Sequence, residues 1–214
     1  IIDEVTYNIN KGKKDIYISK FNLDLEDSGH ICLAKNNIEH VISDTLMCDT
    51  LTRCKLYSLV YLENLPIRNV LLLRSFIEYI DQAEISLSSE SILTTLTHYT
   101  PIAKLFVDYF DVKFNPKVTK KEKCLKVLEL QIDESIKLVP SIMDDRILKL
   151  TYAFIKSIVR TNFYFNKEAI GLKIDTKVFS QNLKGLQPNI ESFVYHPDFF
   201  GIHLRMSNIS RGGL

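Results

Sequence analysis

The sequence predicts an α+β fold, in which a mainly α-helical bundle is flanked by an N-terminal β-hairpin and by short strands near the C-terminus. Apolar residues recur three and four positions apart through most of the chain, which is the spacing of helices that bury one face. Segments of alternating apolar and polar residues stand before and after this region, as in half-buried strands. With 214 residues, of which 46% are apolar, the chain can form one or two domains with a core.

The first residues predict the β-hairpin. Val5–Ile9 and Ile16–Phe21 alternate, and Asn10–Lys13 supply the asparagine and glycine that favour a turn between them. Asp27–Gly29 predict a second turn. Two helices are then expected from apolar residues at helical spacing, which are Ile38, Val41, Ile42 and Leu46 in the first and Leu56, Leu59, Val60 and Leu62 in the second.

Prolines and serines mark the starts of the next helices. Pro66 opens a helix, Ser88–Ser91 form a serine-rich start with an acidic residue in the first turn, and Pro101 opens a helix that ends near Pro116. The face predicted to be buried in the first of these helices consists of Val70, Leu73, Ile77 and Ile80. Because the breaks between successive helices are short and polar, we expect antiparallel packing in a compact bundle.

A run of basic residues precedes the following helix. Lys120–Lys123 contains three lysines and one glutamate, a pattern typical of a solvated loop or a first helical turn, with a binding patch as the less favoured alternative. The helix itself is predicted from Leu125, Leu128, Ile132 and Ile136, and Pro140 ends it.

The central element of the prediction is one long helix between residues 140 and 164, of about twenty residues and about 30 Å. Asp144 and Asp145 suit its start and Arg160 suits its end, since acidic and basic side chains complement the helix dipole there. Its buried face is predicted from Ile147, Leu150, Phe154 and Ile158, and its solvated face from Arg146, Lys149, Lys156 and Arg160. Beyond Tyr164 the pattern changes to strands at 171–175, 192–195 and 201–205, and His196–Asp198 joins the last two.

Composition excludes several classes of protein. The net charge of +1, from 27 basic and 26 acidic residues, argues against binding to a nucleic acid backbone. No apolar run reaches the 18 or more residues that a membrane-spanning helix needs. The four irregularly spaced cysteines predict reduced, buried thiols in a cytoplasmic protein, and the histidines show no metal-binding spacing. Glycine-rich nucleotide motifs and catalytic nucleophile motifs are also absent from the sequence.

Several short motifs, taken in order, resemble one block of the large, bacterial-type NAD-specific glutamate dehydrogenases. The motifs are Asp144–Leu148, Arg160–Tyr164, Leu172–Asp175, Phe193–Tyr195, Gly201–Arg205 and Arg211–Leu214, and the upstream segments Leu71–Phe76, Tyr79–Gln82 and Phe114–Pro116 fit the preceding helical region of that family. The resemblance covers most of residues 50 to 214. Residues 1 to 49 are similar, more weakly, to the end of an ACT-type regulatory domain.

The resemblance implies three parts of a much longer enzyme. Residues 1–49 would be the tail of an ACT-like regulatory module, 50–165 a helical region, and 166–214 the opening strands of the catalytic, substrate-binding domain. The full-length enzyme would be a cytoplasmic homo-oligomer that uses NAD to convert L-glutamate to 2-oxoglutarate and ammonia. The chain starts without methionine and stops before the catalytic lysine and aspartate of the family, so we expect a fragment that is itself non-catalytic.

The resemblance also supplies the candidate substrate-binding residues, Arg211, Gly212 and Gly213. Smaller glutamate dehydrogenases have a similar Lys-Gly-Gly near the side-chain carboxylate of the substrate. A guanidinium group binds a carboxylate with two hydrogen bonds, and glycines let the backbone approach a ligand closely. His203 and Arg205 share one face of their strand, which is either a polar lining near the site or a solvated surface. The alternative from a different class is a stand-alone helical interaction or scaffold protein, or a gene remnant.

Overall fold

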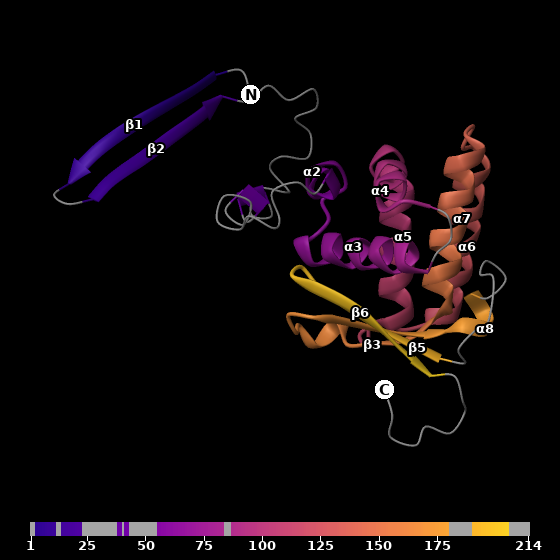
Figure 1. The fold of residues 1–214 in the computed structure, drawn as a ribbon. Coiled ribbons are helices and arrows are strands. Elements are labelled where there is room, and N and C mark those ends of the chain that lie inside the picture. The colour runs from indigo at the N-terminus through magenta and orange to yellow at the C-terminus, as the bar shows by residue number, and fades with distance from the viewer. Residues whose placement is uncertain are drawn as a thin grey trace. The chain divides into compact units, whose positions relative to one another are not determined.

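The computed structural model describes residues 3–11, 14–22, 38–39, 41–42, 55–83, 87–179 and 190–205. The chain divides into two compact units, Ile1–Leu33 and Ala34–Leu214. The first unit contains the predicted hairpin, in which β1 (Asp3–Lys11) pairs antiparallel with β2 (Lys14–Asn22) (Figure 1). The two predicted strands pair as expected, so the hairpin is confirmed, although Asn10 and Lys11 of the predicted turn belong to β1 and residues 12–13 lie outside the described part.

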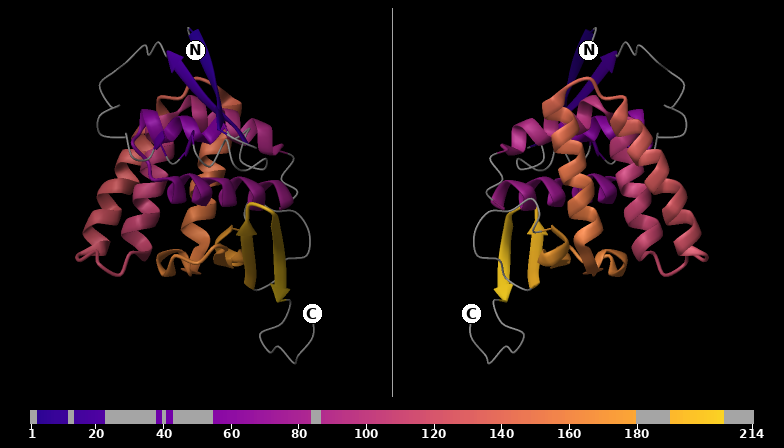
Figure 2. Two further views of the ribbon diagram at one scale, coloured as in Figure 1. Left: turned by 90° about the vertical axis from the view of Figure 1, so that its left-hand side faces the viewer. Right: turned by 90° about the vertical axis from the view of Figure 1, so that its right-hand side faces the viewer.

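The second unit combines helices with one sheet (Figures 1 and 2). Its helical elements are η1 (Lys55–Tyr57), α2 (Ser58–Leu62), α3 (Ile67–Gln82), α4 (Ser89–His98), α5 (Thr100–Phe114), α6 (Lys121–Lys137), α7 (Ile142–Ser157), η2 (Phe163–Phe165) and α8 (Thr176–Phe179). The strands are β3 (Ile158–Thr161), β4 (Ile170–Asp175), β5 (Ile190–His196) and β6 (Phe199–Arg205), in the antiparallel order β3-β4-β5-β6. The predicted α+β class is confirmed.

The predicted helix starts are confirmed, and each has a local cause. The Ser88 hydroxyl accepts a hydrogen bond from the backbone N–H of Ser91 at the start of α4. Ser141 caps α7 in the same way, because its hydroxyl accepts from the N–H of Asp144. Pro101 occupies the first turn of α5, where a missing N–H costs nothing. The basic run Lys120–Lys123 forms the start of α6, one of the two structures predicted for it.

The core lies where α3 and α7 meet the inner face of the sheet. The Tyr79 ring stacks on Phe154, with ring centroids 4.4 Å apart, and meets Phe193 of β5 edge-on at 5.6 Å. Phe76 packs on Phe154 at 5.5 Å and on Phe110 of α5 at 5.8 Å. The predicted face of α3 is buried in full. Helices and sheet of this unit therefore share one core rather than two.

The prediction of one long helix to residue 160 is wrong. α7 ends at Ser157, and the chain passes directly into β3. Ile158 pairs with Ile174 and Arg160 with Lys173 of β4, with a bulge between them. β-branched residues at 158, 159 and 161 favour a strand, and the pairing with β4 satisfies their backbone groups. β3 and the short α8 were not predicted from the sequence.

Other predictions can be checked only in part. Cys124 is exposed on α6, so the prediction of buried thiols is wrong for this residue, and Cys32, Cys48 and Cys54 lie outside the described residues. Residues 38–39 and 41–42 are helical as expected, whereas Leu46 and the turn at Asp27–Gly29 also lie outside that part. Across the ranges that the structure covers, no helix has both the length and the apolar character to cross a membrane.

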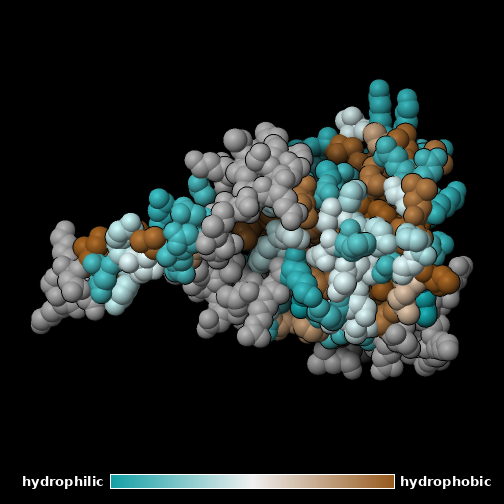
Figure 3. All heavy atoms as spheres, turned by 90° about the horizontal axis from the view of Figure 1, so that it is seen from above, coloured by the Kyte–Doolittle hydropathy of each residue, from teal (hydrophilic) through white to brown (hydrophobic). Residues whose placement is uncertain are grey.

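Apolar side chains also reach the surface of the helical unit. Figure 3 shows hydrophobic residues (brown) among hydrophilic ones (teal) on the face seen from above. Among the large apolar residues that the structure describes, the most exposed are Ile142, with 88% of its surface accessible, and Leu138, with 83%. Both lie at the turn between α6 and α7, where they contribute nothing to the core.

Candidate functional site

The predicted substrate-binding residues Arg211, Gly212 and Gly213 lie outside the described residues. β6 ends at Arg205, six positions earlier in the sequence, and the side chain of Arg205 is outside that part as well. Of the residues considered for the site, the structure therefore describes the side chain of His203 on β6, which was expected to be either a polar lining or a solvated surface.

One row of side chains crosses the outer face of this sheet. Arg160 of β3 pairs with Lys173 of β4, Lys173 pairs with Ser192 of β5, and Ser192 pairs with His203 of β6. Residues directly opposite one another in an antiparallel sheet point to the same face. Arg160 and His203 are exposed, and Lys173 and Ser192 are half-buried. We call these four residues the outer row.

The outer row is cationic at one end. Arg160 and Lys173 are neighbours on adjacent strands. Within the part of the chain that the structure describes, neither forms an ion pair with an acidic side chain. Neighbouring like charges on a sheet repel, so their juxtaposition costs stability unless an anion lies close to them. This end of the row is chemically suited to hold a carboxylate or phosphate.

A hollow of about 300 Å³ lies beside the outer row. Arg160, Lys173 and Ser192 line it together with Asn162, Phe165, Val194 and other residues of the sheet. Gly171 contributes no side chain, and a Cβ there would meet the amide group of Asn162 at 3.6 Å. The exposed surface of the hollow is almost entirely apolar, so Arg160, Lys173 and Ser192 border it without making it polar.

Asn162 fixes the edge of the hollow. Its side-chain amide donates to the carbonyl of Ala169 at 3.0 Å, and its Oδ1 accepts from the backbone N–H of Gly171 at 2.6 Å. These two bonds close the connection between β3 and β4. They hold Asn162 in place directly after Arg160 and Thr161, which limits the positions that Arg160 of the outer row can take.

Arg68 of α3 holds the same connection from the helical side. Its guanidinium donates to the carbonyl of Phe163 through Nε at 3.1 Å and through Nη2 at 2.9 Å, and to the carbonyl of Lys167 at 3.0 Å. The group also lies 4.8 Å from the centre of the Phe163 ring. Burial lowers the pKa of Arg68 from its usual value.

A buried hydrogen bond joins α3 to the inner face of the sheet. The Tyr79 hydroxyl donates to the carboxylate of Glu191 on β5, and both residues are buried. Burial, together with the bond and the charge of Glu191, raises the pKa of Tyr79. Glu191 precedes Ser192 of the outer row by one residue, so this bond fixes the strand from the opposite face.

Two further polar contacts tie α5 to the end of α7 and to the residues after β3. The Tyr164 hydroxyl donates to Asp111 at 2.8 Å. The Lys113 ammonium donates to the last carbonyls of α7, at Ile155 with 3.2 Å and at Lys156 with 2.7 Å. Burial, and secondarily the charge of Lys156, lowers the pKa of Lys113 to about 8.

Sequence reasoning missed most of this site. Arg160 was interpreted as a helix end, and Lys173 and Ser192 were not singled out, whereas His203 was named as a possible polar lining. The strand register brings together residues from three of the motifs that carried the family resemblance, with Ser192 next to a fourth. The presence of polar residues in these separate motifs could have indicated the site, but only with knowledge of the strand order. His196 lies apart from the row, with its Nδ1 3.4 Å from Asp198 in the turn before β6.

Family models match two segments of the chain. Residues 131–214 match the bacterial NAD-glutamate dehydrogenase catalytic domain, and residues 55–116 match helical motif 3 of glutamate dehydrogenase. The Arg68, Tyr79 and Lys113 contacts each join the second segment to the first. The described residues of the two matched segments thus pack against each other.

The chain is also similar to NAD-specific glutamate dehydrogenases from several bacteria. It is 32% identical over 157 residues to that of Halomonas elongata, which covers 71% of this chain, and 33% identical over 185 residues to that of Pseudomonas aeruginosa, which covers 82%. The protein from Mycobacterium tuberculosis is 27% identical over 165 residues, 73% of this chain. The chain spans about a tenth of the length of these curated relatives. With both segments matched in order, the chain belongs to the family of large, bacterial-type NAD-specific glutamate dehydrogenases.

Proposed function

We propose that this chain is part of a longer enzyme that uses NAD to convert L-glutamate to 2-oxoglutarate and ammonia. The proposal is supported by the two family models and by the names of the relatives, each of which is an NAD-specific glutamate dehydrogenase. Because the 214 residues contain no glycine-rich dinucleotide motif, we assign NAD binding and the catalytic step to sequence outside them. The comparisons do not favour the alternative of a stand-alone interaction protein.

Within that enzyme we assign three roles. Residues 1–49 form the end of an ACT-like regulatory module, 50–165 the helical region, and 166–214 the first strands of the substrate domain. The helical region positions those strands, and the buried contacts of Arg68 and Tyr79 support this role. We further propose a cytoplasmic homo-oligomer, in agreement with the family resemblance.

The outer row is the observation that carries the assignment of a substrate-facing sheet. Glutamate and 2-oxoglutarate each have two carboxylates that are ionised at neutral pH. The outer row presents the cations Arg160 and Lys173 beside an open hollow. Arg211, Gly212 and Gly213 then follow β6 in sequence, with a guanidinium group that can bind a carboxylate through two hydrogen bonds. In this proposal the outer row attracts the substrate and Arg211 binds its side-chain carboxylate.

The experiment uses the complete reading frame that contains this chain. Reduction of NAD is followed at varied L-glutamate concentration. Arg211→Gln is expected to raise KM about a hundredfold, because the loss of a charge-assisted, bidentate contact costs about 3 kcal/mol. Arg146→Gln, on the exposed face of α7, is the control and should leave KM unchanged. Absence of glutamate-dependent NAD reduction in the full-length protein would refute the proposal.

A second measurement concerns the 214-residue chain by itself. Calorimetric titration with NAD and with L-glutamate should give no measurable heat of binding, since the remaining walls of the site are assigned to other sequence. Tight binding of NAD to this chain would contradict that assignment.

A further inference from the structure

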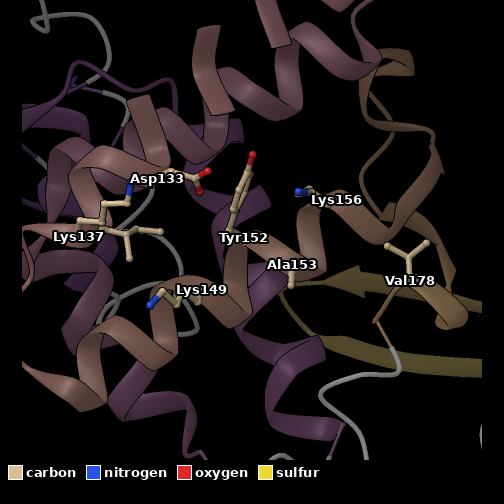
Figure 4. Close-up of a pocket in the computed structure, with 8 residues that line it drawn as sticks. Asp133, Lys137, Lys149, Tyr152, Ala153, Lys156 and Val178 are labelled. Carbon is tan, nitrogen blue, oxygen red and sulfur yellow. The ribbon is translucent and has the colours of Figure 1, made fainter. Parts of the chain in front are cut away.

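α6 lies at the edge of the second unit, as both views in Figure 2 show. One side of the helix packs against α5 and α7. Next to α7 it borders a hollow, to which α6 contributes Asp133 and Lys137 and α7 contributes Tyr152 and Lys156 (Figure 4). The charged side chains there point in separate directions, so the hollow offers no common point for a ligand. The remaining side of α6 faces away from the core.

This outward side carries a row of four exposed residues, Lys123, Val127, Leu130 and Glu134. They stand four, three and four positions apart, which is the heptad spacing of helices that pack side by side. At 3.6 residues per turn, the row lies on the opposite side of α6 from the buried Ile132. We call these four residues the α6 stripe.

The middle of the α6 stripe is apolar although it is open to water. Val127 is 50% exposed and Leu130 is 64% exposed. α6 already contacts the core through Ile132 and Ile136 on its other side, so these two residues are not needed to hold the helix in place. Exposed apolar residues at heptad spacing indicate a surface for another helix.

The two ends of the α6 stripe carry opposite charges. Lys123 begins it and Glu134 ends it, and among the side chains that the structure describes neither forms an ion pair. A second α6 that runs parallel would place like charges together at both ends. In the antiparallel orientation, Lys123 of each copy faces Glu134 of the other, and Val127 of each copy faces Leu130 of the other. The stripe is therefore complementary to itself.

We propose that the α6 stripe is a self-association surface, on which α6 of a second copy of this chain packs antiparallel. The two-fold axis passes between positions 128 and 129. Charge complementarity identifies the occupant, because a uniformly acidic or uniformly basic helix would meet a like charge at one end. The inference gives a contact surface to the homo-oligomer proposed above. It is tested without substrate, so its failure and that of the proposed reaction are distinguishable.

The test is sedimentation equilibrium of the 214-residue chain at low salt, with a reductant that prevents disulfide-linked dimers through the exposed Cys124. One pair of helices is a small interface, so we expect a monomer–dimer equilibrium with a dissociation constant of about 100 μM. Leu130→Ser should weaken the dimer about a hundredfold, because the dimer contains this apolar contact twice. Lys123→Glu and Glu134→Lys should each weaken it about tenfold, because each places like charges at both ends.

A mixture of the two charge variants distinguishes a second copy from other causes. In a mixed dimer of Lys123→Glu with Glu134→Lys, opposite charges face each other at both ends, so the mixture should associate as tightly as the unsubstituted chain. Lys167→Glu and Glu168→Lys are the matched controls, because both residues are exposed in the connection between β3 and β4. Neither control should change the dissociation constant, alone or in a mixture.

Three results would overturn the proposal. The first is a chain that stays monomeric at millimolar concentration, which would leave the α6 stripe to another part of the long polypeptide. The second is equal weakening by Lys123→Glu and Lys167→Glu, which would indicate general charge effects. The third is a mixture of charge variants that associates no more tightly than either variant alone. Circular dichroism of each variant separates loss of association from loss of folding, and the charge variants decide the question if Leu130→Ser does not fold.

Discussion

Replacing Tyr79 by phenylalanine tests whether the helices hold the sheet through the buried hydrogen bond to Glu191. The substitution removes only the hydroxyl and keeps the ring that stacks on Phe154. A hydrogen bond to a charged group contributes about 1.5 to 3 kcal/mol, and the carboxylate left behind is 7% exposed, so water cannot replace the donor. We expect Tyr79→Phe to lower the free energy of unfolding by about 3 kcal/mol.

The assay is urea unfolding followed by circular dichroism at neutral pH. Tyr164→Phe is the matched control, because it removes the same hydroxyl from a half-buried tyrosine bonded to Asp111, and should cost about 1 kcal/mol. The double variant Tyr79→Phe/Glu191→Leu should recover about 2 kcal/mol, since it no longer buries an unpaired carboxylate. If Tyr79→Phe costs no more than Tyr164→Phe, the buried bond does not join helix to sheet in the way described.

Three further predictions concern the connections around the sheet. Arg68→Lys should lower the free energy of unfolding by about 2 kcal/mol in the same urea assay, because one ammonium cannot replace three guanidinium hydrogen bonds and the contact with the Phe163 ring; a cost below that of an exposed arginine substitution would contradict this. Asn162→Ala should lower the free energy of unfolding by about 2 kcal/mol and speed hydrogen exchange of the Gly171 amide. Asn162→Asp should retain the hydrogen bond to that N–H. Unchanged exchange in the alanine variant would contradict the role given to the Asn162–Gly171 bond. Lys113 has a folded-state pKa of about 8, below its usual 10.5, so the unfolded chain binds more protons between these values and stability should rise with pH across them. The full pKa difference would raise the free energy of unfolding by about 3 kcal/mol, which solvent screening reduces to about 1 kcal/mol. Lys113→Met should lack this rise when unfolding is measured as a function of pH. An identical pH profile for both proteins would refute the prediction.

Local signals were sufficient for most helices of this protein. Ser88, Pro66 and Pro101 mark helix starts by effects confined to one turn, so the sequence predicts them without knowledge of the fold. The end of α7 depends on a distant partner. Ile158–Thr161 continue an amphipathic pattern that suits a helix, and only pairing with β4 makes them a strand.

The candidate site shows the same limit more strongly. Arg160, Lys173, Ser192 and His203 are separated in sequence and become neighbours only through the order of four strands. The Tyr79–Glu191 bond joins residues 112 positions apart, and no local pattern predicts such a pair. The family resemblance identified the motifs correctly, but the register explains why polar residues of separate motifs belong together.

The direct passage from α7 into β3 has a mechanical consequence. No flexible residues separate Ser157 from Ile158, and Lys113 secures the final carbonyls of the helix from a neighbouring element. A tilt or axial shift of α7 would therefore displace Arg160 by nearly the same amount. A force applied to α7 would reach the strand as a rigid-body displacement, so this junction is well suited to transmit a movement of the helix to the sheet.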